Sequence, residues 1–202
     1  MLDLSICALC GGTKHVSAEK GGFIRCPECF LRAALERVLV QHGYPKIWAN
    51  ASLEAIVSVL GEDHPVVKAL VGLQSGAIQS VHFFGGPSES RETIFAATLR
   101  IFLTNSQQIN ILDTADLAPK HFEKDRHMNR LKSVPTMITV GKEIERKLGA
   151  FYLRDALEFA VPRRLPLVLF SDTDYDGLKM YYGEFRELYK YARFTQVQIP
   201  ES

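Results

Sequence analysis

Residues 81–98 read Val-His-Phe-Phe-Gly-Gly-Pro-Ser-Glu-Ser-Arg-Glu-Thr-Ile-Phe-Ala-Ala-Thr. An apolar run leads into a Gly-Gly-Pro turn, and apolar residues at helical spacing follow the turn. The stretch therefore predicts a strand, a glycine turn and a helix from about residue 93, in direct succession. This order of elements is the layout of a loop that binds phosphate ahead of a helix.

The residues that hold phosphate in such a loop are replaced. In the pattern G-x-x-x-x-G-K-[ST], Gly86 takes the first place and Thr93 the last. Arg91 stands where the second glycine belongs, and Glu92 stands where the lysine belongs. Unit charges about 4 Å apart interact by roughly 4 kcal/mol at an effective dielectric near 20, so Glu92 turns an attraction for phosphate into a comparable repulsion. We expect that neither ATP nor magnesium binds here.

Composition bounds the class of protein. The chain has 202 residues, of which 47% are hydrophobic and 23% charged, which fits one ordinary domain with a small appendage. A net charge of +1 gives no overall basic field of the kind that marks many nucleic-acid-binding proteins. Residues 119–164 carry eleven Lys/Arg against six Asp/Glu, which fits either phosphate contacts or a solvated helical face. Without a signal peptide or a long apolar run, we expect a cytoplasmic protein with no membrane partner.

The four cysteines lie together near the start of the chain. Cys7 and Cys10 form one C-x2-C pair, Cys26 and Cys29 form another, and fifteen residues separate the pairs. This spacing predicts a structural zinc site with four thiolate ligands, in a ribbon with strands at 13–20 and 22–25. His15 lies between the pairs, but four cysteines already complete the ligand shell. A disulfide framework is the alternative, and the absence of an export signal disfavours it.

Beyond the cysteines, apolar residues recur at the spacing of helices in some segments and at the spacing of strands in others. Helices are expected at 30–40, 52–60 and 64–73. Strands are then expected at 80–84, 108–112, 136–140, 165–171 and 195–199, and helices at 93–103, 115–122, 144–160 and 177–191. This alternation predicts an α/β fold with a parallel sheet covered by helices on both faces.

This order of features resembles the bacterial helicase loaders of the DnaC and DnaI type and their IstB-type transposon relatives, several of which carry a zinc ribbon before an AAA+ ATPase domain. The resemblance rests on the cysteine knuckles and on residues 42–54, 80–100 and 109–117. It implies a zinc ribbon and docking helix at 1–44 and an AAA+-like, degenerate P-loop domain at 45–202. Arg32 and Arg37 lie on the proposed docking helix.

Two more ATPase motifs of that family are altered. Ile138 and Thr139 occupy the places of its two acidic residues, and Asp172 occupies the place of its sensor asparagine. The arginine that acts on a neighbouring subunit has no clear match, although Lys190 or Arg193 approximates it. Three separate parts of one catalytic apparatus are thus missing together.

The resemblance therefore implies a pseudo-ATPase with no catalytic residue. We expect it to act in DNA replication as an adaptor or regulator that binds a replicative helicase, an active helicase loader or single-stranded DNA.

The segment around Asp172 and Asp174 permits an enzyme as the alternative. Asp-x-Asp-x-x-Gly after an apolar strand resembles the magnesium motif of Toprim domains, which perform nucleotidyl transfer or nuclease chemistry on DNA. Such a site needs a glutamate at the end of an earlier strand, and only Glu143 is near, at poor spacing.

A calcium loop and a helix cap are the other interpretations. The run from Asp172 to Gly177 resembles the opening of an EF-hand, but the twelfth position is Gly183 where a glutamate is required. The interpretation that we favour is a polar turn whose aspartates cap the helix that begins near Gly177.

Overall fold

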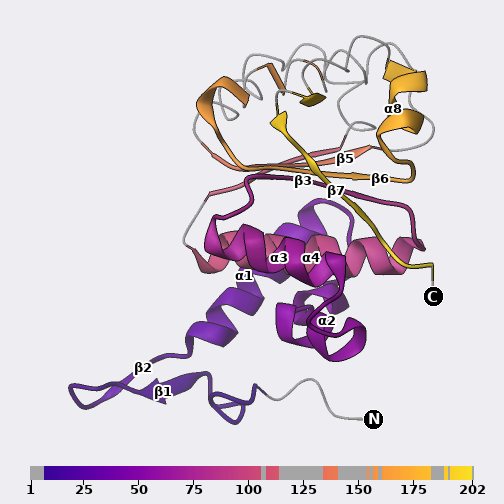
Figure 1. Cartoon of the computed structure of the whole chain (residues 1–202). Coiled ribbons are helices and arrows are strands. Elements are labelled where there is room, and N and C mark those ends of the chain that lie inside the picture. Colours follow the sequence, from indigo (N-terminus) through magenta and orange to yellow (C-terminus); the bar gives the residue numbers. More distant parts are fainter. Residues whose placement is uncertain are drawn as a thin grey trace.

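The computed structural model describes residues 7–105, 108–113, 134–140, 154, 157–158, 161–182, 189–190 and 192–201, without the side chains of residues 163 and 179–182. A parallel sheet lies at the centre of these residues, with helices on both of its faces (Figure 1). This arrangement confirms the predicted α/β fold class.

The sheet has five strands in the order β4-β5-β6-β3-β7, and every neighbouring pair is parallel. The strands are β3 (Ser80–Phe84), β4 (Asn110–Asp113), β5 (Thr136–Val140), β6 (Leu167–Ser171) and β7 (Thr195–Gln198). Buried on both faces, β3 and β6 read as nearly continuous apolar runs, as strands of covered parallel sheets do. Phe83 stacks on Phe170 across this pair at a centroid distance of 5.3 Å.

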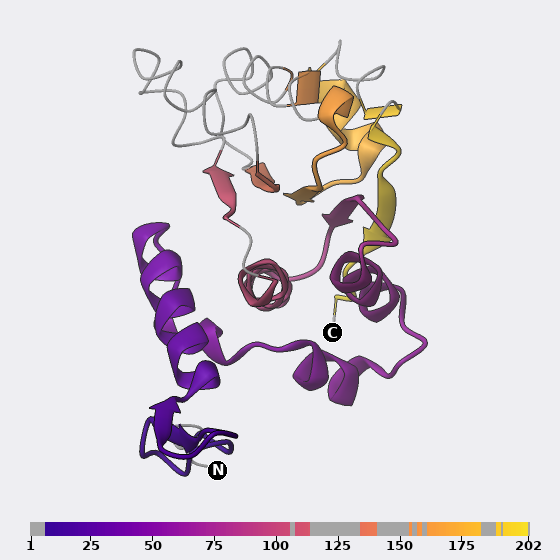
Figure 2. The same cartoon turned by 90° about the vertical axis from the view of Figure 1, so that its left-hand side faces the viewer.

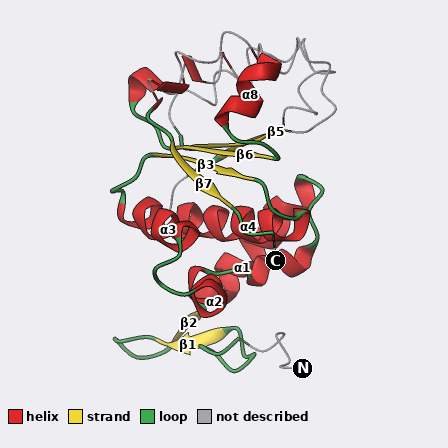
Figure 3. Cartoon of the chain, turned by 45° about the vertical axis from the view of Figure 1, so that its right-hand side comes forward, coloured by secondary structure: helices red, strands yellow, loops and turns green. Residues whose placement is uncertain are grey.

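Helices α3 (Pro65–Ser75) and α4 (Ser88–Thr104) cover one face of the sheet, and α8 (Tyr175–Tyr182) lies on the other (Figure 3). Beyond α4 lie α1 (Pro27–Gln41), the 3-10 turn η1 (Lys46–Asn50) and α2 (Leu53–Leu60). Another 3-10 turn, η3 (Val161–Arg163), leads into β6. No described helix combines the length and the apolar character needed to cross a membrane.

Three helices begin earlier than the periodicity predicts, and one of them, α8, starts at Tyr175 and not at residue 177. Helix α1 starts at Pro27, whose fixed φ suits the first helical position, and not at residue 30. Helix α4 starts at Ser88, directly after Pro87, and not at residue 93. The predicted helix at 115–122 and most of the one at 144–160 lie outside the described residues.

The cysteine-rich segment forms an antiparallel hairpin of β1 (His15–Ser17) and β2 (Phe23–Arg25), both shorter than predicted. Gly21 and Gly22 have φ of +84° in the turn between them, a conformation that favours glycine. Helix α1 leads from this hairpin to the core, where it packs against α4 (Figure 2). Leu35 and Leu39 of α1 are fully buried in that core. The division into units at residue 44 stays a prediction.

Candidate functional site

The predicted phosphate loop lies at the carboxyl ends of β3 and β6. The chain leaves β3 toward α4 on one face of the sheet and leaves β6 toward α8 on the other (Figure 1). Such a reversal between neighbouring parallel strands opens a crevice, and ligands of open α/β sheets bind in crevices of this kind. The loop, the altered sensor position and the replaced acidic pair all lie around this point.

The loop itself is three residues long. Only Gly85, Gly86 and Pro87 separate β3 from α4, so the later positions of the phosphate-binding pattern are helical. Gly86 has φ of +66°, and a Cβ there would lie 2.5 Å from Cγ2 of Ile199 and 3.0 Å from the carbonyl oxygen of Pro200. The chain after β7 therefore closes over the turn. The extended loop that turns backbone N–H groups toward a phosphate is absent from this turn.

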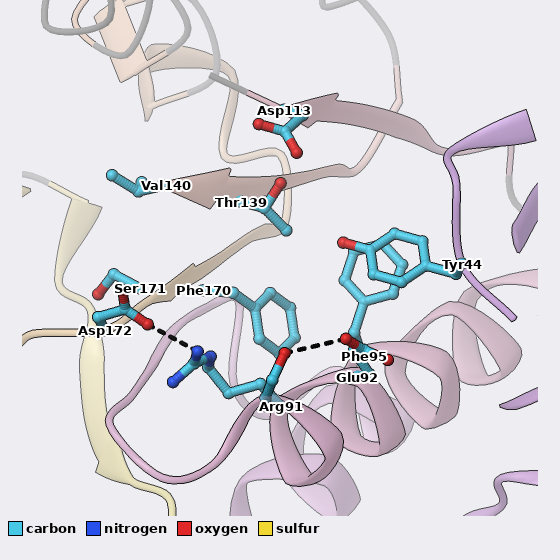
Figure 4. Close-up of a pocket in the computed structure, with 11 residues that line it drawn as sticks. Tyr44, Arg91, Glu92, Phe95, Asp113, Thr139, Val140, Phe170, Ser171 and Asp172 are labelled. Atoms are coloured by element: carbon cyan, nitrogen blue, oxygen red, sulfur yellow. Dashed lines mark hydrogen bonds and ion pairs between the residues drawn. The ribbon is translucent and has the colours of Figure 1, made fainter. Parts of the chain in front are cut away.

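Arg91 fills the position beside the turn. Its Nη1 donates to the carbonyl oxygens of Gly85 at 3.1 Å and Gly86 at 2.6 Å. Its Nη2 lies 2.7 Å from Oδ1 of Asp172 (Figure 4). The positive charge of Arg91, at the second glycine position of the pattern, is thus paired with the negative charge of Asp172, at the expected sensor position.

Glu92 is also held by its neighbours. Oε2 accepts a hydrogen bond from Nε1 of Trp48 at 2.7 Å, and Oε1 accepts one from the hydroxyl of Ser88 at 3.0 Å. The carboxylate that replaces the phosphate-binding lysine therefore has two donors within the chain. The sequence showed the charge of Glu92 but did not indicate Trp48 and Ser88 as its partners.

A cavity of about 220 Å³ lies over these residues, below the roughly 300–1,000 Å³ of ordinary small-molecule sites. Among its described lining residues, three carry carboxylates, Glu92, Asp113 and Asp172, and one carries a guanidinium, Arg91. The ring of Tyr44 stacks on the ring of Phe95, and both line the cavity. Burial, together with the negative charge of Asp113, raises the pKa of the Tyr44 hydroxyl to about 12. The cavity is small, acidic and aromatic.

The positions of the missing acidic pair lie on β5. Ile138 is buried in the sheet, and Thr139 faces the cavity opposite Tyr44 (Figure 4). Neither side chain offers a carboxylate for a metal ion. The structure thus brings residues 91–92, 139 and 172 together around one cavity, and Ile138 lies next to Thr139 in β5.

The other aspartates of the 172–177 segment do not gather ligand atoms. Asp174 precedes α8, and its Oδ1 accepts the backbone N–H of Gly177 at 2.9 Å, which confirms a helix cap. Among the described residues, the cysteines bring three or more metal-ligating side chains together, and the aspartates do not. Glu143 of the Toprim alternative and Gly183 of the calcium alternative lie outside the described residues.

The four cysteines converge as the spacing predicts. The Sγ atoms lie within 4.8 Å of one another, with Cys7 to Cys26 at 3.7 Å and Cys10 to Cys29 at 3.5 Å. Sulfurs of a tetrahedral site with metal–sulfur bonds near 2.3 Å are about 3.8 Å apart, so the cluster fits a metal ion.

The thiols of this cluster also affect one another's protonation. The hydrogen bond with Cys10, followed by burial, raises the pKa of Cys29 to about 12. A central cation would offset this crowding of sulfur atoms. Nδ1 of His15 lies 3.1 Å from the carbonyl oxygen of Thr13, apart from the four sulfurs, which agrees with leaving it out of the ligand set.

A buried polar chain beneath α8 was not foreseen. Nδ1 of His82 lies 2.8 Å from the hydroxyl of Tyr189, and Nε2 lies 2.7 Å from Oγ of Ser171. Because Ser171 donates to the carbonyl oxygen of Thr173, the imidazole donates from Nε2 and accepts at Nδ1. Burial lowers the pKa of His82 to about 3, so the ring is neutral. A lone histidine within an apolar strand was the available signal.

Comparison with solved structures identifies the fold. A structure of DnaI is 14% identical with a TM-score of 0.59, over 78% of this chain and 92% of that one. A putative primosome component from Streptococcus pyogenes serotype M3 is 11% identical with a TM-score of 0.55, over 78% and 90%. The replication initiator DnaA bound to AMPPCP and single-stranded DNA is 14% identical with a TM-score of 0.59, over 75% of this chain and half of that one.

The sequence by itself gives no comparable match. No family model matches it, and no curated protein matches it significantly. The likeness lies in the arrangement of the sheet and helices. The chain therefore shares its fold with the solved structures of DnaI, the primosome component and DnaA.

Proposed function

We propose that this chain is a helicase-loader-like protein of DNA replication that works by binding and does not hydrolyse ATP. In this role it is an adaptor or regulator that engages a replicative helicase or an active loader in the cytoplasm. Single-stranded DNA is a further candidate ligand. The fold shared with DnaI and with the replication initiator DnaA is the reason for proposing a role in DNA replication.

The observation that carries the proposal is the position of Arg91. Its guanidinium is held by two carbonyl oxygens of the turn and by Asp172. A nucleotide phosphate at this turn would have to displace a paired charge. It would also lie among Glu92, Asp113 and Asp172, where each carboxylate about 4 Å away costs roughly 4 kcal/mol at an effective dielectric near 20.

The cysteine hairpin supports a binding role. We propose that the ion it holds is zinc, as a folding device, because a hairpin of this size buries too little apolar surface to be stable alone. Around the cysteines, large apolar side chains are exposed: Leu9 by 57%, Phe23 by 80%, Ile24 by 53% and Phe30 by 66%. Exposed apolar groups of this kind favour a protein partner.

An ATP titration tests the absence of nucleotide binding. Ligand at a hundredfold its dissociation constant stabilises a protein by about 2.7 kcal/mol, which raises the melting temperature of a chain of this size by about 5–10 °C. We expect no rise with ATP and magnesium, while an ATP-binding DnaI-type loader in the same buffer shows one. Trp48, the only tryptophan, contacts Glu92 and gives an independent fluorescence signal. A saturable change in either signal would contradict the proposal.

Binding to the purified replicative helicase of the host tests the adaptor role. Phe23→Ser with Ile24→Ser should weaken that binding by about tenfold or more, since exposed aromatic anchors dominate many interfaces. Val59→Ser, which removes an apolar side chain that is 81% exposed on α2, is the matched control and should leave binding unchanged. Absence of binding to both the helicase and an active loader would remove the adaptor role.

A further inference from the structure

A second cavity lies at the other end of the strands from the turn at residues 85–87. It occupies about 700 Å³ at the amino ends of β3, β6 and β7, beside Ser80, Leu167 and Thr195. This volume is within the range of ordinary small-molecule sites. Because the strands are parallel, the two cavities lie at opposite ends of the sheet. They share none of their described lining residues, so a ligand in one need not contact the other.

The described charged residues that line this second cavity are all cationic. They are Arg164 and Arg193, and none of the described lining residues carries a carboxylate. Both are exposed, and neither guanidinium pairs with a carboxylate among the described residues. The other lining groups are hydroxyls and an amide, such as Gln79, and apolar side chains, such as Ile78.

The backbone at both arginines is unusual. Arg164 has φ of +52° and Arg193 has φ of +51°, and they are two of the three non-glycine residues with positive φ in the described part of the chain. Each ends a helical turn, with its N–H bonded to the carbonyl oxygen three residues earlier, that of Val161 or Lys190, at 3.1 Å. Glycine is the favoured residue in that conformation. Both positions carry a cationic side chain in its place.

We propose that this cavity binds a phosphate group between Arg164 and Arg193. The planar guanidinium donates two parallel hydrogen bonds to phosphate oxygens, and two of them facing one cavity form a clamp for a single dianion or two adjacent diesters. Ser80 and Thr195 add hydroxyl donors, and the apolar wall accommodates a base or sugar. The phosphate is that of a nucleotide, either free or within single-stranded DNA.

The experiment uses the full chain and two probes, thymidine 5′-monophosphate and an oligothymidylate of about twelve nucleotides. Arg164→Gly and Arg193→Gly should each weaken binding by roughly tenfold, as expected for loss of one charged hydrogen-bonding group. For the oligonucleotide, the double variant should also flatten the slope of log K against log salt by about 1.4, that is, two phosphates at about 0.7 each.

The variants separate loss of binding from loss of folding. Glycine adopts positive φ without strain, so the melting temperature should stay equal or rise. Lys46→Gln removes one positive charge from the exposed surface of η1, outside the lining of this cavity, and should leave binding unchanged. Binding of the monophosphate identifies a free nucleotide as the ligand, and binding of the oligonucleotide alone identifies a DNA strand. No binding of either probe, or equal binding by the double variant and Lys46→Gln, overturns the proposal.

Discussion

Nη2 of Arg91 and Oδ1 of Asp172 lie 2.7 Å apart at the carboxyl ends of β3 and β6, and both side chains are largely buried. Each residue replaces an uncharged one in the loader pattern, a glycine in the loop and an asparagine at the sensor. A single buried charge without a partner is costly, whereas the two together satisfy each other. The charges at residues 91 and 172 therefore stabilise each other in the folded chain.

Breaking this pair should destabilise the fold. Asp172→Asn leaves the guanidinium of Arg91 without its anion, and we expect the free energy of unfolding to fall by about 1–3 kcal/mol in urea denaturation. Asp63→Asn is the matched control, because the Asp63–Lys68 pair is fully exposed at the carboxylate and should contribute less than about 0.5 kcal/mol. Equal effects of the two changes would show that the Arg91–Asp172 pair contributes little to stability.

The closure of the turn by the C-terminal segment predicts a costly Gly86→Ala. The added Cβ meets Ile199 and the backbone of Pro200, and φ of +66° is itself strained for alanine. Gly43→Ala, with φ of +78° and open space around it, isolates the backbone cost of about 1–2 kcal/mol. We expect Gly86→Ala to cost about 1–3 kcal/mol more than this control, measured by chemical denaturation. Equal costs would mean that Ile199 and Pro200 yield freely.

His82 should make the stability depend on pH. Burial lowers its pKa from 6.5 to about 3 in the folded chain, so between these values the unfolded chain binds a proton that the folded chain does not. The contribution is complete above pH 6.5 and is lost as the pH falls toward 3. Between pH 7 and pH 5.5 the loss is about 1 kcal/mol.

Urea denaturation of His82→Gln tests this dependence. The variant should lose that part of the pH dependence, whereas the exposed His15→Gln should retain it. An identical pH profile in His82→Gln and the parent protein would show that another group is responsible.

The cysteine cluster should bind one zinc ion per chain. Cys26→Ser removes a buried ligand, and we expect zinc measured by mass spectrometry to be lost. Circular dichroism should still report the core helices, because α3 and α4 pack on the sheet without the hairpin. His15→Ala should keep its zinc, since the ring lies outside the four sulfurs. Metal-free protein with an intact hairpin would refute the zinc assignment.

Local patterns predicted the strands well. The strands at 80–84 and 136–140 have the predicted bounds, because each is an apolar run that ends at a turn or a polar residue. The start of α4 was predicted five residues late. Its first turn is Ser-Glu-Ser-Arg, which carries no apolar periodicity, and Pro87 provides no side-chain cap. Helix ends depend on such polar turns and are therefore hard to locate by periodicity.

Contacts between segments that are far apart along the chain could not be predicted from the sequence alone. The sequence showed a charge at residue 91 and another at residue 172, but their meeting depends on β3 and β6 being neighbours in the sheet. The same holds for His82 with Tyr189, and for Gly86 with Ile199. No local signal marked Trp48 as the partner of Glu92.

The amino-acid sequence by itself determined the alternation of strands and helices, the four-sulfur cluster and the charged residues 91 and 92 after the glycine turn. These follow from periodicity and spacing within short segments, where burial and ligand geometry act directly on neighbouring residues. The tertiary structure alone decided which charges neutralise one another and that Arg164 and Arg193 line the same cavity. Such pairings arise from strand order, which brings together residues that no local interaction connects.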